Sequence, residues 1–135
     1  MGAYLAQRSP APSLVLCSTA RRARETLDAL LEHLSEDTTL RIDQSLYLAA
    51  PESLLDALRA APDTAASILL VGHNPGIEQL ASALARSGPP DAIRRMRAKF
   101  PTAAVAELEA EIERWRDLEP AGAQLVEFCT PKDLV

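Results

Sequence analysis

The stretch that decides the fold is LVLCSTARRARET, residues 14–26. Its first four residues form a continuous apolar run, which is typical of a strand buried on both faces of a parallel sheet. Ser18 or Thr19 can cap the following helix, and apolar residues recur at helical spacing from Ala20 to about Leu34. The stretch therefore predicts a strand that leads directly into a helix.

Two further units of this kind follow along the chain. Residues 38–42 alternate in polarity and predict a strand, after which Pro51 opens a helix that runs to about Ala60. Residues 68–71 are apolar throughout and predict another strand, followed by a helix over residues 76–85. Strands that alternate with helices of this length indicate an α/β fold with a mostly parallel sheet.

The C-terminal third gives a less uniform pattern. Residues 103–116 begin like a strand but also carry apolar residues at helical spacing, and the pattern alone favours a helix. Residues 125–128 predict a final strand, which Pro131 ends.

Length and composition limit the classes of protein to consider. The 135 residues fit a single domain, residues 1–135, and a net charge of -5 argues against a nucleic-acid partner. No apolar run approaches the roughly 20 residues that cross a bilayer, and the first residues lack the order of a secretory signal. We therefore expect no membrane association and a cytoplasmic protein. Cys17 and Cys129 lack the spacing of a metal or redox pair and are expected to be buried.

Ser18 and Arg22 lie where the first predicted strand passes into its helix. Ligands bind at the carboxyl ends of strands in parallel sheets, and a helix N-terminus there offers free N–H groups to an anion. Most arginines on a helix only solvate its surface, but Arg22 belongs to the first turn, beside the expected crevice. A guanidinium at this place can grip phosphate oxygens in a bidentate manner.

A second candidate site is the segment Gly72-His73-Asn74-Pro75, directly after the strand over residues 68–71. A lone histidine is usually structural, but this one falls in the same predicted crevice, next to a glycine that permits close approach to the backbone. His33 is expected near a helix end at the surface, in a structural role. An arginine and a histidine at two strand ends suggest electrostatic stabilisation of a transferring phosphoryl group.

These residues resemble the signatures of a known superfamily. Ser18-x-x-x-Arg22-Ala23-x-x-Thr26 and Val71-Gly72-His73-Asn74-Pro75 are similar to two motifs of the histidine phosphatases. Within that superfamily the chain resembles the short SixA-type phosphohistidine phosphatases over essentially its whole length. The further matching segments are Leu46-Tyr47, Leu54-Leu55, Lys99-Phe100-Pro101-Thr102 and Thr130-Pro131-Lys132-Asp133-Leu134.

The resemblance implies a phosphoglycerate mutase-like fold, a three-layer α/β/α sandwich with a mostly parallel central sheet, and a strand over residues 102–108. It implies removal of phosphate from a protein histidine through a phosphohistidine enzyme intermediate, with no cofactor and no metal. Arg22 would bind the phosphoryl oxygens and His73 would donate to them, with Ser18 and Asn74 in the phosphate-binding pocket. The partner would be a phosphohistidine-bearing protein, which would bind at an open site.

One family motif has no counterpart, because the sequence contains no Arg-His-Gly, the segment that carries the nucleophilic histidine. Residues 1–6 look like the end of the family's first helix, so we expect its N-terminal strand to be missing. Strands next to it would keep unpaired edges, a route to self-association. We therefore predict that this chain hydrolyses phosphohistidine poorly.

Two alternatives remain. The chain is a non-catalytic phosphate-binding regulatory module, which the missing nucleophile favours, or a small-molecule phosphomonoesterase of the same superfamily. Such enzymes carry an acidic proton donor between the two motifs. Asp43, Glu52 and Asp56 lie there, none in a recognised context.

Overall fold

The computed structural model describes residues 1–7 and 11–134. The helices are α1 (Gly2–Ala6), α2 (Arg21–Leu30), α3 (Pro51–Arg59), α4 (Gly76–Leu84) and α5 (Pro90–Ala98). The strands are β1 (Leu14–Ser18), β2 (Thr39–Asp43), β3 (Ile68–Val71), β4 (Ala85–Ser87), β5 (Val105–Glu109) and β6 (Ala123–Cys129). The described residues also form four 3-10 turns: η1 (Leu31–His33), η2 (Gln44–Leu46), η3 (Trp115–Asp117) and η4 (Pro131–Leu134).

The described strands form two three-stranded sheets, in the orders β2-β1-β3 and β4-β6-β5. The first sheet is entirely parallel, with Cys17 opposite both Ile42 and Val71. In the second sheet β4 is parallel to β6, and β5 is antiparallel to β6. The predicted α/β class with mostly parallel strands is confirmed.

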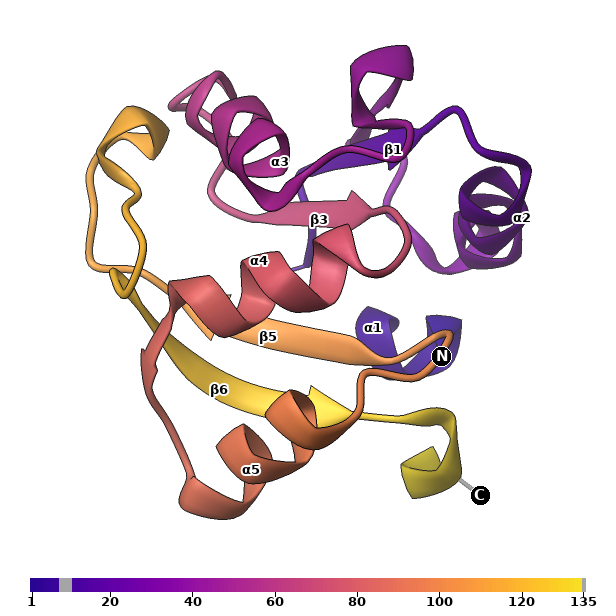
Figure 1. Cartoon of the computed structure of the whole chain (residues 1–135). Helices are drawn as coiled ribbons and strands as arrows, with labels where there is room; N and C mark the ends of the chain where they lie inside the picture. The colour runs from indigo at the N-terminus through magenta and orange to yellow at the C-terminus, as the bar shows by residue number, and fades with distance from the viewer. Residues whose placement is uncertain (8–10, 135) are drawn as a thin grey trace.

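Helices cover both faces of the sheets (Figure 1). Successive residues of β1 point to opposite faces, as a strand requires. Leu14 and Leu16 therefore pack with α3 and α4, whereas Val15 and Cys17 pack against α2. Figure 1 also shows α1 behind β5, on the side away from α4. This arrangement gives the three layers that the family resemblance implies.

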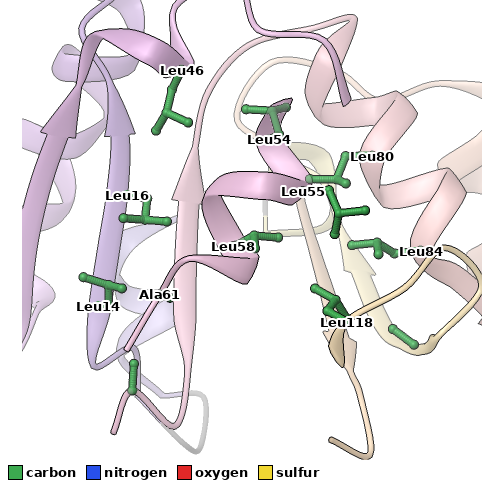
Figure 2. Close-up of a cluster of buried hydrophobic side chains, with 12 residues drawn as sticks. Leu14, Leu16, Leu46, Leu54, Leu55, Leu58, Ala61, Leu80, Leu84 and Leu118 are labelled. Carbon is green, nitrogen blue, oxygen red and sulfur yellow. The ribbon is translucent and has the colours of Figure 1, made fainter. Parts of the chain in front are cut away.

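Helix α4 links the cores of the two sheets. Its Leu80 and Leu84 belong to a cluster that reaches from β1 through α3 to β6 (Figure 2). Its Ala81 belongs to a second cluster with residues of α5 and β6. The two sheets are thus held together by side chains that pack along one helix.

The segment 103–116 corrects the pattern-based prediction of a helix, and agrees with the strand that the family implies. It contains β5 and then, after a loop, the turn η3. Leu108, Ile112 and Trp115 all pack against the same core cluster from this strand, loop and turn. Their helical spacing therefore reflects a shared core rather than one helical face.

Other details also differ from the predictions. The N-cap residue of α2 is Ala20 rather than Ser18 or Thr19, and α2 ends at Leu30, where the turn η1 takes over. Helix α5, which was not predicted, begins at Pro90, with Pro89 as its N-cap residue. Proline is favoured in the first turn of a helix because its missing N–H has no partner there in any case.

The arginines of α5 have structural partners. Arg94 pairs with Asp91, Arg95 makes two hydrogen bonds to the carboxylate of Asp133, at 2.8 and 3.0 Å, and Arg97 bonds the carbonyl of Ala85 at 3.2 Å. The Thr130 N–H and the Arg95 guanidinium hold the pKa of Asp133 below its usual value. Residues 130–134, which resemble the family, thus form a turn in which Asp133 binds both the N–H of Thr130 and Arg95 of α5.

Across residues 1–7 and 11–134, no helix combines the length and the apolar character that spanning a membrane requires.

Candidate functional site

Three loops meet at the carboxyl edge of the first sheet. They follow β1, β2 and β3, and these strands end side by side, because Cys17 is the partner of Val71 and Ser18 is the partner of Asp43. The parallel order therefore brings together segments that are far apart in the sequence. The loop after β1 leads to Arg22 and lies between the other two loops. His73 lies in the loop after β3.

Ser18 and Arg22 occupy the central loop and the first turn of α2. Ser18 is fully buried, and its hydroxyl accepts a hydrogen bond from the N–H of Ala20 at 3.1 Å. The hydroxyl of Thr26 donates to the carbonyl of Arg22 at 3.0 Å. Arg22 is exposed, and its guanidinium makes no hydrogen bond or ion pair with another described residue. It is therefore available to an incoming anion.

His73 is held by the loop that follows β2. The N–H of Leu48 donates to its Nε2 at 3.0 Å, and the ring of Tyr47 lies edge-on, with 6.1 Å between the ring centroids. A nitrogen that accepts a hydrogen bond carries no proton, so neutral His73 holds its proton on Nδ1. Leu48 reaches this position with a φ of 49°, a left-handed conformation that costs energy for leucine.

Asn74 uses both ends of its side-chain amide inside the protein. Its Nδ2 donates to the carbonyl of Phe100 at 2.7 Å, and its Oδ1 accepts from the N–H of Glu78 at 3.2 Å. The side chain therefore positions the loop between β3 and α4 and joins it to the segment before β5. Its predicted contact with phosphate stays a prediction.

The edge has a favourable field for an anion. Helices α2 and α4 both begin there, after β1 and β3, and helix N-termini carry partial positive charge.

Asp43 is the last residue of β2, and a hydrogen bond from the N–H of Ser45, 2.8 Å long, lowers its pKa. A carboxyl group held ionised in this way is poorly suited to donate a proton, which argues against Asp43 as the acid of a phosphomonoesterase.

The contacts of Leu48 were not predicted, because a main-chain N–H leaves no signal in a sequence pattern. A related signal does exist at Gly76, the first residue of α4. A Cβ atom there would overlap the carbonyl oxygen of Ala49. The glycine thus lets the loop over residues 47–49 lie against the start of α4, within reach of His73.

We predict that Gly76→Ala displaces this loop and breaks the hydrogen bond from Leu48 to His73. The new methyl group meets backbone, which cannot swing aside, so we expect a loss of about 1 to 3 kcal/mol in the free energy of unfolding. Nitrogen NMR of the imidazole would show both tautomers where the parent shows the Nδ1–H form.

The matched control is Gly72→Ala, where the nearest atoms, at 3.1 Å, belong to the side chain of Ile77. That side chain can move, so the control should leave the His73 tautomer unchanged. An unchanged tautomer in Gly76→Ala would show that the loop does not hold the ring.

Among the described residues, no group of three or more histidine, cysteine, aspartate or glutamate side chains is arranged to hold a metal ion.

His33 lies in η1, beyond the C-terminal end of α2 and thus at the opposite end of that helix from Arg22. Its Nε2 is 3.3 Å from the carboxylate of Glu32.

Comparison with curated proteins finds close relatives of unknown activity. No family model matches the chain. An uncharacterised protein of Mycobacterium leprae is 39% identical over 132 residues, which are 97% of this chain and 79% of that protein. An uncharacterised protein of Mycobacterium tuberculosis H37Rv is 38% identical over 133 residues, which are 97% of this chain and 81% of that protein.

Comparison with solved structures finds one recurring fold. A protein assigned as phosphohistidine phosphatase SixA from Nakamurella multipartitia matches with a TM-score of 0.83 and 31% identity, over 96% of this chain and 77% of that one. A protein with the same assignment from Agrobacterium tumefaciens matches with a TM-score of 0.74 and 28% identity, over 96% and 75%. A protein histidine phosphatase SixA complexed with tungstate has a TM-score of 0.75 at 19% identity, over 99% and 78%, which shows the fold alone.

Proposed function

The chain belongs to the SixA-type family of histidine phosphatases, and from that membership we propose that it acts on phosphate carried by a histidine of another protein. The observation that carries the proposal is the meeting of two strand ends. β1 leads to Ser18 and Arg22, and the neighbouring strand β3 leads to His73. The carboxyl edge of these strands, with two helix N-termini beside it, is a favourable position for a phosphoryl group.

Arg22 is proposed to grip two oxygens of the phosphoryl group. Its guanidinium is exposed and forms no ion pair with another described residue, so binding of a phosphoryl group breaks no existing ion pair there. The N-terminal ends of α2 and α4 add the attraction of unpaired N–H groups. Ser18 is proposed to shape the pocket from below, because its hydroxyl already holds the N–H of Ala20.

His73 is proposed to donate from Nδ1 to a phosphoryl oxygen as charge develops there. Its Nε2 is occupied by the N–H of Leu48, so Nδ1 carries the proton of the neutral ring. Donors that are already oriented before the reaction stabilise a transition state without further rearrangement. The Tyr47 ring and the loop over residues 47–49 would keep the imidazole in that orientation.

The family reaction also needs a nucleophilic histidine. In that reaction the nucleophile attacks phosphorus, the P–N bond of the substrate breaks, the leaving imidazole takes up a proton, and water then releases phosphate from the enzyme. The 135 residues contain two histidines and no Arg-His-Gly. His73 serves as a donor and His33 lies beyond the far end of α2. We propose that this chain by itself binds phosphoryl groups but transfers them slowly.

The test is phosphate release from a phosphohistidine-bearing phosphotransfer protein. The 135-residue chain is compared with a version that has an apolar strand ending in Arg-His-Gly added at its N-terminus, each with and without His73→Ala. We expect release only from the longer version, and a fall of about a hundredfold or more with His73→Ala, within the range typical of losing a catalytic donor. Rapid release by the 135-residue chain would contradict the proposed impairment, and release unaffected by His73→Ala would contradict the site.

A non-catalytic phosphate-binding role is the second candidate, and the lack of Arg-His-Gly favours it. It predicts that neither version releases phosphate, while the chain still binds phosphate or tungstate. One fold neighbour is known in complex with tungstate, a phosphate analogue, which makes this oxyanion a suitable probe. Failure of both release and binding would contradict both candidates.

A further inference from the structure

The loop over residues 47–49 displays two large apolar side chains at the candidate site. Tyr47 is 52% exposed and Leu48 is 69% exposed. Both residues contact His73, Tyr47 through its ring and Leu48 through its main-chain N–H. Apolar surface that is open to solvent therefore borders the imidazole that we propose as a donor.

The loop is fixed on both sides of these residues. Before it, the side chain of Leu46 is 2% exposed and belongs to the core cluster shown in Figure 2. After it, Gly76 leaves room for the carbonyl oxygen of Ala49. The N–H groups of Tyr47 and Ala49 donate to carbonyls of the turn η2, at 3.0 and 3.4 Å. The exposed side chains thus belong to a loop whose main chain is anchored by hydrogen bonds and packing.

Leu48 is an unusual residue for its backbone conformation. Its φ of 49° is left-handed, which costs energy for a residue with a bulky side chain and little for glycine. Glycine would donate the same N–H to His73, so that hydrogen bond does not require leucine. The side chain is also too exposed to belong to the buried core. An apolar side chain kept on a strained backbone beside the site indicates a role toward a ligand.

We propose that Tyr47 and Leu48 form an apolar wall for the imidazole ring that carries the phosphoryl group of the substrate. This role rests on the proposed function, since it requires the phosphoryl group to lie at Arg22 and His73. In a phosphohistidine, the group attached to phosphorus is a flat ring with apolar faces. A tyrosine ring packs favourably against such a ring edge-to-face or offset, and a leucine adds dispersion contacts.

The wall distinguishes a phosphoryl group on a ring from one on a short alkyl chain. Arg22 and the helix N-termini contact only the oxygens, which are the same in both cases, so they give no preference. The ring alone covers the apolar surface of Tyr47 and Leu48 and removes it from water. A tenfold preference corresponds to about 1.4 kcal/mol, which burial of roughly 55 Å² of apolar surface supplies. The wall therefore determines specificity, whereas Arg22 determines the affinity for the anion.

The experiment compares two peptides of one sequence that carry the same phosphonate group. In the first peptide the phosphonate is attached to a triazole ring, a stable substitute for phosphohistidine. In the second it is attached to an unbranched alkyl side chain. Both peptides and tungstate are titrated by calorimetry into the unaltered 135-residue chain. We expect the ring-bearing peptide to bind at least tenfold more tightly than the alkyl peptide.

Leu48→Ala tests the wall directly, since alanine keeps the main-chain N–H that donates to His73. The measured quantity is the affinity for the ring-bearing peptide divided by the affinity for tungstate, so that a change in the anion site itself cancels. We expect this ratio to fall at least fivefold. The matched control is Leu40→Ala, because Leu40 is 43% exposed on β2, outside the loop, and its loss should leave the ratio unchanged. A ratio that both variants lower equally, or that neither lowers, would overturn the proposal.

Tyr47 is tested by a conservative and a disruptive substitution. Tyr47→Phe keeps the ring and should retain the preference for the ring-bearing peptide, whereas Tyr47→Ala should lower the ratio at least threefold. Equal ratios for these two variants would overturn the role of the ring.

Failure of the wall and failure of the proposed function give different results. If tungstate binds and the unaltered chain binds the two peptides equally, the wall is overturned and the anion site stands. If neither tungstate nor either peptide binds, the anion site is overturned, and the wall with it.

Discussion

Arg22→Ala is expected to weaken tungstate binding by at least about tenfold, with little change in stability. Each charge-assisted hydrogen bond to an oxyanion is worth about 1.5 to 3 kcal/mol, and about 1.4 kcal/mol corresponds to a factor of ten. The exposed guanidinium has no described partner whose loss would destabilise the fold. Isothermal titration calorimetry at a fixed salt concentration measures the change.

Arg21→Ala is the matched control, because it removes the same charge one residue away. Arg21 is 91% exposed and pairs with Glu25 at 2.8 Å, on the surface of α2. We expect its effect on tungstate affinity to stay below about threefold, as is typical of a screened surface charge. Equal losses in the two variants would mean that general charge, and not the position of Arg22, attracts the anion. Arg22→Lys should recover part of the affinity, since lysine keeps the charge but not the bidentate fork.

The second large effect is expected in the core. Leu54→Ala should lower the free energy of unfolding by about 2 to 5 kcal/mol, the range for deleting a buried leucine side chain. Leu54 is 2% exposed and belongs to the cluster that joins α3, α4 and β1 (Figure 2). Its Cδ1 also lies against Gly76, so the same cavity opens beneath the loop that holds His73.

Denaturant unfolding followed by circular dichroism measures this loss, with Leu40→Ala as the control. Leu40 is 43% exposed on the edge strand β2, so the same chemical change there should cost less than about 1 kcal/mol. Similar midpoints for the two variants would show that the cluster around α3 contributes less than its burial indicates.

The sequence pattern predicted a strand best where all residues of that strand have the same, apolar surroundings. The apolar runs at 14–17 and 68–71 predicted β1 and β3 to within one residue, because both strands pack against helices on the two faces of the sheet and need apolar side chains on both. Strands of a parallel sheet end at the same edge, so the order of the motifs was enough to predict that Arg22 and His73 follow strands that end at one edge of the sheet.

Other features depend on contacts between distant segments and leave no local pattern. The hydrogen bond from Leu48 to His73 uses a main-chain N–H, and Asn74 is tied to the carbonyl of Phe100, 26 residues away. The short strand β4 pairs with β6 over few residues and was not predicted. The pattern over residues 103–116 predicted a helix wrongly, because apolar residues of a strand, a loop and a turn pack against one core cluster.

The division of the sheet has a consequence for motion. The loops of the site all follow strands of the first sheet, so a movement of the second sheet reaches them where a contact crosses between the two sheets. On the same side of the molecule, the amide of Asn74 crosses to Phe100, ahead of β5. Collective movements of this kind take microseconds to milliseconds. A hinge motion between the two halves would therefore reach the imidazole of His73 through its neighbour in the sequence, the Asn74 side chain.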